Sequence, residues 1–219
     1  MKNLQKIGGI AALYAGLAFV VGMVGFLAVV DVESVADPVG QIALMADNLA
    51  FLYIMYLIVY VIWGGFMVVL SLALYERLKD GAPAIMQIAT AFGIIWSGVI
   101  IANGMIHNNG MQNVVDLYAT DPAQAGTVWL AIGSVLDGLA GGNEALGGMW
   151  ILLLSWAALQ TEKMPKVLNY LGAVVGAAGI VSLVPALAEI FIMIFGLGQI
   201  VWFIWLGIVM LRDKASAAV

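Results

Sequence analysis

The chain of 219 residues contains no cysteine and a single histidine, His107. Without cysteine it can form no disulfide, no thiolate metal site and no iron–sulfur cluster. With one histidine it can hold neither a bis-histidine haem nor a three-histidine zinc site within one chain. These two shortages exclude the commonest side-chain ligand sets for metal ions and haem, and the sequence does not identify a cofactor.

Charged side chains are also scarce, at 10% of residues against 64% hydrophobic, and the mean hydropathy is +1.08. Soluble domains are about 25% charged, so this chain has too few polar side chains to cover a water-facing surface. We therefore expect an integral membrane protein whose main partner is the lipid bilayer. The net charge of −5 disfavours nucleic acid as a partner, because proteins that bind it carry basic patches.

Six mainly apolar runs reach the length of about 20 residues that a transmembrane helix needs, and none alternates like a transmembrane β-strand. We predict an all-α polytopic bundle with six transmembrane helices, forming one domain over residues 1–219. A short amphipathic segment around Gln41 is expected on the surface between the first two spans. The predicted spans are 7–30, 49–75, 83–106, 141–160, 167–188 and 190–211.

The basic residues all fall on one side of the membrane if there are six spans. By the positive-inside rule, that side is the cytoplasm, so both termini of this multi-pass cell-membrane protein are expected there. The eight basic residues are Lys2, Lys6, Arg77, Lys79, Lys163, Lys166, Arg212 and Lys214.

Two outer segments need a separate interpretation. Residues 107–126 are polar and are expected to form a loop, in which Asp121-Pro122 marks a turn or a helix start. The apolar residues 127–136 either extend the fourth span outward or form a separate interfacial helix. A break before that span is favoured by three glycines, Gly138, Gly141 and Gly142.

Several segments carry a family resemblance: LQKIGGIAALYAGLA at residues 4–18, LAGGNEALGGMWILLLSWAAL at 139–159 and KMPKVLNYLGAVVGAAG at 163–179. Together they make the whole chain resemble an uncharacterised bacterial family of six-span membrane proteins, known only as a domain of unknown function. The resemblance implies a six-helix inner-membrane fold, and it implies no activity.

Helix geometry brings several polar residues to one depth near the outer face. Counting back from Gln160 at about 1.5 Å per residue places Asn143 and Glu144 just inside the outer boundary of about 30 Å of hydrocarbon. An ionisable residue at such a depth usually faces the interior of the bundle. The candidate ligand-binding residues are Asn103, His107, Asn143, Glu144, Glu189, Gln199, Tyr53, Tyr56 and Tyr60.

Each of these candidates also has a simpler structural interpretation. The three tyrosines recur at helical spacing and suit a packed aromatic stripe, and His107 suits a helix cap or loop. His107, Glu144 and Glu189 are only weak candidates for a metal site. The other outer acids are expected to be solvated: Asp31, Glu33, Asp37, Asp116 and Asp121.

Three functional hypotheses remain open. The first is binding or passage of a small ligand at a polar cavity that opens outward. The second is a structural or accessory subunit of a larger membrane complex. The third is a membrane enzyme that uses His107 with Glu144 or Glu189. The absence of charge at the bilayer midplane disfavours an ion-coupled carrier.

Partners other than lipid also remain open. Gly172 and Gly176 form a small-xxx-small pair, which mediates close helix packing in membranes. Such a pair serves either packing within the bundle or the seam of a homo-oligomer, and a partner membrane subunit is a further possibility.

Overall fold

A computed structural model describes residues 2–212, with side chains from Asn3 onward, and these residues form helices and connecting turns without a strand. The all-α prediction is therefore confirmed for this part of the chain. Lys214 and the side chain of Lys2, on which the predicted orientation partly rests, lie outside it. The α-helices are α1 (Lys2–Val24), α2 (Pro38–Asp47), α3 (Leu49–Tyr56), α4 (Trp63–Leu78), α5 (Pro83–Tyr118), α6 (Pro122–Thr161), α7 (Lys166–Val181) and α8 (Ala188–Arg212), and the π-helical segments are η1 (Gly25–Val29) and η2 (Leu57–Ile62).

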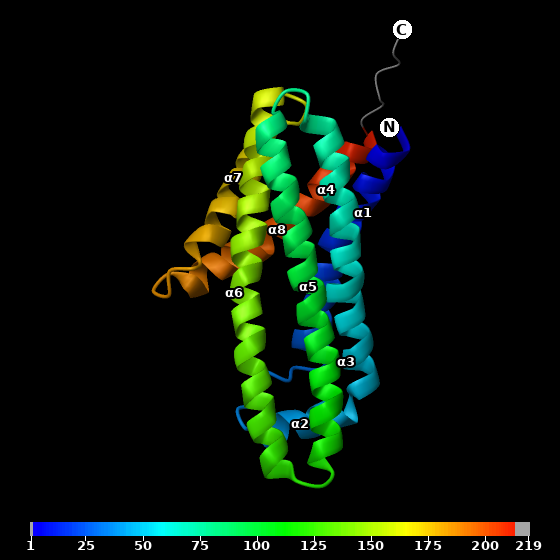
Figure 1. Cartoon of the computed structure of the whole chain (residues 1–219), viewed down its shortest axis with the longest axis vertical. Helices are drawn as coiled ribbons and strands as arrows, with labels where there is room; N and C mark the ends of the chain where they lie inside the picture. The colour runs from blue at the N-terminus through cyan, green and yellow to red at the C-terminus, as the bar shows by residue number, and fades with distance from the viewer. Residues whose placement is uncertain (1, 213–219) are drawn as a thin grey trace.

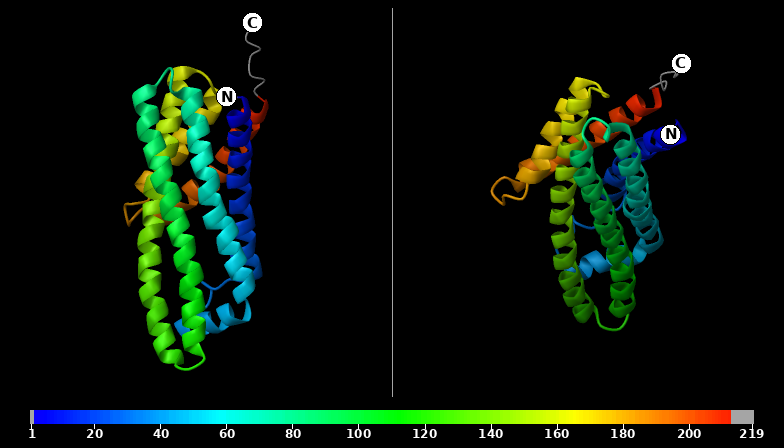
Figure 2. Two further views of the ribbon diagram at one scale, coloured as in Figure 1. Left: turned by 45° about the vertical axis from the view of Figure 1, so that its right-hand side comes forward. Right: turned by 45° about the horizontal axis from the view of Figure 1, so that its top comes forward.

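The long helices pack as a closed ring that follows the order of the chain. Helix α1 packs on α4, α4 on α5, α5 on α6, α6 on α7, α7 on α8, and α8 returns to α1. Figure 1 shows α5 and α6 standing side by side, while α8 crosses behind them as a diagonal. The α4–α5 and α6–α7 connections and both ends of the described chain lie at the same end of the molecule (Figures 1 and 2). Such an arrangement needs only short connections between neighbours.

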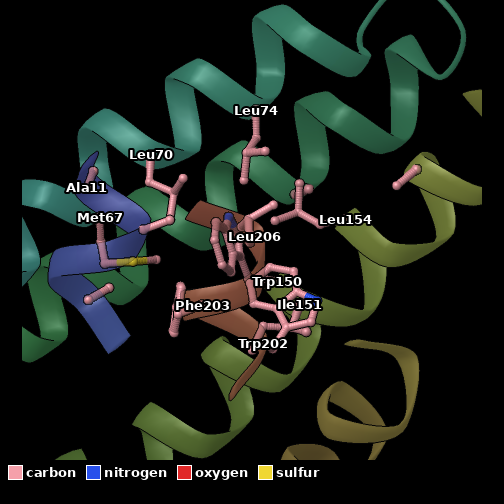
Figure 3. Packing of buried hydrophobic residues seen from close by; sticks show 14 of the residues in the cluster. Ala11, Met67, Leu70, Leu74, Trp150, Ile151, Leu154, Trp202, Phe203 and Leu206 are labelled. Carbon is pink, nitrogen blue, oxygen red and sulfur yellow. The ribbon is translucent and has the colours of Figure 1, made fainter. Parts of the chain in front are cut away.

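Aromatic rings fill the middle of the ring of helices. The ring centroids of Trp63 and Trp96 are 4.9 Å apart. The centroid distance is 5.7 Å between Trp96 and Trp150 and 5.8 Å between Trp150 and Trp202. Phe203 lies among them, within 6.4 Å of each of the four rings. Figure 3 shows Trp150, Trp202 and Phe203 converging from α6 and α8. This core closes the centre of the bundle, and its Trp63 also lines the cavity described below.

Glycines let α6 and α7 touch backbone to backbone. A Cβ atom on Gly176 would lie 2.6 Å from the backbone nitrogen of Leu152 and 2.7 Å from the carbonyl oxygen of Gly148. A Cβ on Gly179 would lie 2.8 Å from the carbonyl oxygen of Glu144. The small-xxx-small pair of α7 therefore packs within the chain, as the first of its two interpretations requires.

Five helical segments are long and apolar enough to cross a membrane: Asn3–Val29, Leu49–Leu78, Pro83–Tyr118, Pro122–Thr161 and Ala188–Arg212. Several such segments in one chain are typical of a multi-pass membrane protein.

The predicted span 167–188 is shorter than expected, because α7 ends at Val181 after 16 residues. At about 1.5 Å per residue, α7 is about 24 Å long, less than the hydrocarbon thickness of about 30 Å. The Ser182 hydroxyl donates to the carbonyl oxygen of Gly179 at 2.8 Å, and the chain then turns until α8 begins at Ala188. The sixth crossing remains a prediction.

The polar segment 107–126 is mostly helical, so the prediction of a loop there was wrong. Helix α5 continues to Tyr118 and the turn is confined to residues 119–121. Asn108, Met111 and Val114 are buried at a spacing of three residues, against α6 and the α2–α3 segment. The polarity of this segment is that of an amphipathic helix with one solvated face. At its end Asp121 accepts from the backbone nitrogen of Gln124 at 3.0 Å, which confirms the predicted helix start.

Helix α6 runs without a break through Gly138, Gly141 and Gly142, contrary to the favoured break. Each glycine costs a helix about 1 kcal/mol relative to alanine, and the helix is nevertheless continuous between the buried Leu136 and Gly147 on either side of them. Of the two alternatives for residues 127–136, the structure has the long helix. Helices α5 and α6 are about 54 and 60 Å long at about 1.5 Å per residue, so their hairpin projects well beyond one hydrocarbon layer.

The predicted amphipathic segment is the helix α2, which packs across the projecting hairpin (Figure 1). It begins at an Asp37 cap, whose carboxylate accepts from the backbone nitrogen of Gly40 at 2.9 Å. Ile42 and Met45 are buried on one side of the helix. Gln41 accepts from the Trp129 indole at 2.8 Å, which ties α2 to α6. This helix braces the α5–α6 hairpin.

Candidate functional site

A cavity of about 510 Å³ lies in the half of the ring of helices that is remote from the basic end, the half that the sequence predicts to be the outer one. Its walls come from α1, η1, the η1–α2 connection, α5, α6, α8 and the continuous helical rod that α3, η2 and α4 form together. Glu144 lies 17 residues before the end of α6 at Thr161, which places it about 26 Å along the helix from the basic end of the molecule. The cavity therefore occupies the depth at which the sequence predicts a polar layer.

The structure brings six of the nine predicted residues to this cavity. They come from the α3–η2 rod, α5, α6 and α8, which are far apart in the sequence. The six lining residues are Tyr56, Tyr60, His107, Asn143, Glu144 and Gln199.

The other three predicted residues lie outside the lining. Asn103 is buried behind His107, and Glu189 is exposed in the first turn of α8. The Tyr53 carbonyl oxygen accepts from the Asn108 amide at 3.3 Å, so Tyr53 is tied to the α3–α5 contact. The tyrosines thus divide: Tyr56 and Tyr60 face the cavity, and Tyr53 does not line it.

His107 is held by stacking and by one hydrogen bond. Its ring stacks on Tyr56 with centroids 4.2 Å apart and lies 5.7 Å from the ring of Tyr60. Its Nδ1 lies 3.1 Å from the carbonyl oxygen of Asn103. A carbonyl oxygen only accepts, so Nδ1 carries the proton and the neutral ring leaves Nε2 as an acceptor.

Asn143 and Glu144 bring adjacent polar side chains from α6. The Trp96 indole donates to Asn143 Oδ1, which fixes the amide against the aromatic core. Glu144 is half-buried, and no ion pair involves it in the described part of the chain. The carboxylate is therefore available to a ligand that carries a positive charge or a hydrogen-bond donor.

Gln199 is the deepest polar residue of the lining. Its side chain is only 3% exposed, and its Oε1 has no hydrogen-bond partner. A buried acceptor without a donor costs about 1–3 kcal/mol, so such groups in native proteins need an explanation. Because Oε1 itself has almost no accessible surface, Gln199 borders the cavity through its other atoms.

Both π-helical segments border this cavity. Phe26 and Leu27 of η1 line one side, and Val59 and Tyr60 of η2 line another. The Tyr14 hydroxyl donates to the carbonyl oxygen of Ile58 at 2.8 Å, which satisfies a carbonyl within η2. Single-turn π-helical segments within α-helices occur frequently at functional sites, and here they re-aim side chains toward the cavity.

Sequence reasoning missed two kinds of lining residue. Asp31 and Glu33, expected to be only solvated, line the outer end of the cavity, although Glu33 remains exposed. The available signal was their position directly after the first span, at the depth of Glu144. The missed aromatic residues carry no such signal, because an aromatic ring in an apolar helix is usually core: Phe19, Phe26, Trp63 and Phe195.

A metal site receives no support from this arrangement. Among residues 2–212, no three histidine, aspartate or glutamate side chains gather closely enough to hold a metal ion. Glu189, one of the three weak candidates, lies outside the cavity that His107 and Glu144 share.

Comparison with known proteins gives a family. The family model described as Domain of unknown function (DUF4386) matches residues 10–209. No curated protein and no solved structure matches the chain. The matched range includes the whole lining of the cavity and all of the helices of the ring except the first turns of α1 and the last residues of α8. The chain therefore belongs to the DUF4386 family, whose function is unknown.

Proposed function

We propose that the protein binds, or passes, a small ligand at the cavity in the outer half of the bundle. The observation that carries this proposal is one cavity of about 510 Å³ that gathers His107, Glu144 and Gln199 from three helices. Ligand sites are typically apolar hollows with a few convergent polar groups. Glu144, which lines the cavity and forms no ion pair within residues 2–212, supports a ligand that donates a hydrogen bond.

We further propose that the chain crosses a bacterial inner membrane six times, with both termini in the cytoplasm. The support is the gathering of basic residues at one end of the molecule. There Arg77 donates to the carbonyl oxygen of Lys163 at 2.7 Å, and Lys163 donates to the carbonyl oxygen of Arg77 at 2.9 Å. Lys79 and Lys166 lie at the same end, which is the cytoplasmic side under the positive-inside rule.

A role as a subunit of a larger membrane assembly, or of a homo-oligomer, is the second candidate. The observation in its favour is the outer part of α6, where Leu130 is 60% and Val135 54% exposed. A partner could cover these side chains. That candidate predicts a tightly packed bundle without an outer cavity, so the cavity favours ligand binding.

Native mass spectrometry of the protein in a mild detergent, with elemental analysis, tests ligand binding. Gly196 lines the cavity, and a Cβ there would meet no heavy atom within 4 Å, so Gly196→Phe places a ring in the hollow without a backbone clash. Gly98→Phe is the matched control, because Gly98 also has open space around it but lies outside the lining.

We expect the natural chain and Gly98→Phe to retain one small molecule at a fixed stoichiometry, and Gly196→Phe to lose it. A natural chain that carries only loosely bound lipid, and no molecule sensitive to Gly196→Phe, would contradict ligand binding. Co-purification of a protein partner in that case would favour the subunit candidate.

A further inference from the structure

The cavity lies where two neighbouring helices of the ring separate. Helices α1 and α8 pack closely near the basic end, where a Cβ on Gly207 would lie 2.9 Å from the carbonyl oxygen of Gly9. At mid-length, a Cβ on Gly16 would lie 3.2 Å from the carbonyl oxygen of Ile200. Beyond Gly16, the cavity is lined by α1 from Phe19 onward and by α8 between Ile192 and Ile200. The ring is therefore closed at one end of the α1–α8 seam, while the seam borders the cavity at the other.

The side chains along this open seam are apolar and exposed. Met23 and Leu27 line it from α1 and η1, and Met193 and Leu197 line it from α8. Each of the four is between 44% and 61% exposed. All four belong to segments long and apolar enough to span a membrane, and this apolar, exposed side of the cavity suits contact with lipid tails.

The charge of the lining has one sign. Asp31, Glu33 and Glu144 contribute three carboxylates, and no lysine or arginine is among the lining residues. None of the three carboxylates forms an ion pair within residues 2–212. Charge complementarity therefore favours a cation over an anion or a zwitterion.

Aromatic faces reinforce this preference. Tyr56, Tyr60 and Trp63 line the cavity from α3, η2 and α4, and Phe19 and Phe26 line it from α1 and η1. Aromatic faces attract ammonium groups within about 6 Å, most strongly where water is excluded. An apolar cavity surrounded by such rings suits an organic cation better than a hydrated metal ion.

His107 supplies an acceptor in the wall of the cavity. Its Nδ1 is bonded to the carbonyl oxygen of Asn103, which leaves Nε2 of the neutral ring as an acceptor. An alkylammonium group carries N–H donors, and its hydrogen bonds to a carboxylate are strengthened by charge. An alkylammonium group would therefore suit both the His107 acceptor and the carboxylates.

We propose that the ligand is a membrane-dissolved cationic amphiphile, whose ammonium head enters the polar part of the cavity and whose apolar body lies along the α1–α8 seam. This inference rests on the proposed ligand-binding function and names the class of ligand.

Binding of defined probes to the full-length protein in phosphatidylcholine nanodiscs tests the class. Dodecylamine, dodecanol and dodecanoate share one tail and differ in head charge, and ethylamine has the head without the tail. Quenching or enhancement of the tryptophan fluorescence reports binding, since Trp63 lines the cavity. We expect dodecylamine to bind at least about tenfold more tightly than the other three probes, the factor that corresponds to one strong charge-assisted or cation–π contact.

Two variants test separately whether the charged head group is recognised and whether the cavity is the binding site. Glu144→Gln keeps the shape of the side chain and removes its charge, and it should weaken dodecylamine by about tenfold while leaving dodecanol unchanged. Asp116→Asn is the control, because this exposed acid lies outside the lining. Gly196→Phe should abolish the binding of every probe that occupies the cavity.

Equal binding of the three long-chain probes, all lost in Gly196→Phe, would overturn the cationic class and leave ligand binding standing. Preference for dodecanoate, or a Glu144→Gln effect shared by dodecanol, would also overturn it. Binding of ethylamine as tight as that of dodecylamine would overturn a ligand taken from the bilayer. Probe binding that is insensitive to Gly196→Phe would contradict the cavity itself as the site.

Discussion

Gly176 illustrates how a single missing side chain positions two helices. A Cβ at this position would meet backbone atoms of α6 at 2.6 and 2.7 Å, and backbone atoms cannot rotate away as the end of a long side chain can. Gly176→Ala should therefore push α7 from α6. We expect a loss of about 1–3 kcal/mol of stability and an apparent melting temperature lower by about 3–10 °C, measured by thermal unfolding in detergent.

The matched control for Gly176→Ala is Gly98→Ala, because a Cβ on Gly98 would meet nothing within 4 Å. Replacing a helical glycine by alanine in open space should be neutral or slightly stabilising. Equal melting temperatures for the two variants would show that the α6–α7 contact tolerates a wider separation than the structure has.

Single residues of the site were predictable to different degrees. Glu144 and Gln199 stand out in the sequence because a polar side chain within an apolar helix needs a reason to be there. Tyr53 looks equivalent to Tyr56 and Tyr60 by spacing, yet only the latter two line the cavity. Tyr53 lies one turn before Tyr56 in α3, where its carbonyl oxygen accepts from Asn108, and residue spacing alone does not show at which turn of a helix a cavity ends.

The π-helical segment η2 depends on a contact from another helix. The Tyr14 hydroxyl of α1 donates to the carbonyl oxygen of Ile58 at 2.8 Å, and its ring stacks on Phe66 with centroids 4.4 Å apart. Tyr14→Phe keeps the ring and removes the donor. We expect a loss of about 1–2 kcal/mol and faster amide hydrogen exchange confined to residues 57–62.

Tyr170→Phe is the control for that experiment, since Tyr170 is 59% exposed on α7. It should change neither stability nor exchange within η2. Unchanged exchange at residues 57–62 in Tyr14→Phe would show that η2 holds its geometry without the hydroxyl.

Element lengths show where hydropathy stops being informative. The apolar runs located the helices of the ring, but hydropathy ends a span where water begins, whereas a helix ends where its backbone bonds and packing end. Helix α5 therefore continues through the polar residues 107–118, because Met111 and Val114 pack there. Helix α7 stops early because Ser182 caps its last turn and Pro185 follows in the connection.

At the scale of the whole molecule, the two ends of the α5–α6 hairpin should lie on opposite sides of the membrane. The absence of cysteine makes every introduced cysteine a unique label. Ala119 is exposed at the outer turn, and Asp80 is exposed in the α4–α5 connection at the basic end. We expect a membrane-impermeant maleimide to label Ala119→Cys in intact cells and Asp80→Cys only after permeabilisation.

The unmodified chain, which contains no thiol, is the control for background labelling. The reverse pattern would place the basic end outside and contradict the cytoplasmic termini. Labelling of both variants in intact cells would mean that the hairpin does not cross the membrane.

Composition and hydropathy alone determined that this protein is helical and embedded in a bilayer, because too few polar residues exist to cover it and lipid requires every backbone group to be bonded within the chain. They also placed Glu144 and Gln199 at a depth where a polar residue calls for a reason. Only the tertiary structure decided that α1 and α8 separate beside them, that the π-helical turns aim Tyr60 and Phe26 inward, and that Asp31 and Glu33 reach the same hollow. These features depend on contacts between residues far apart in the chain, and no local pattern of apolar and polar residues encodes the angle at which two helices cross.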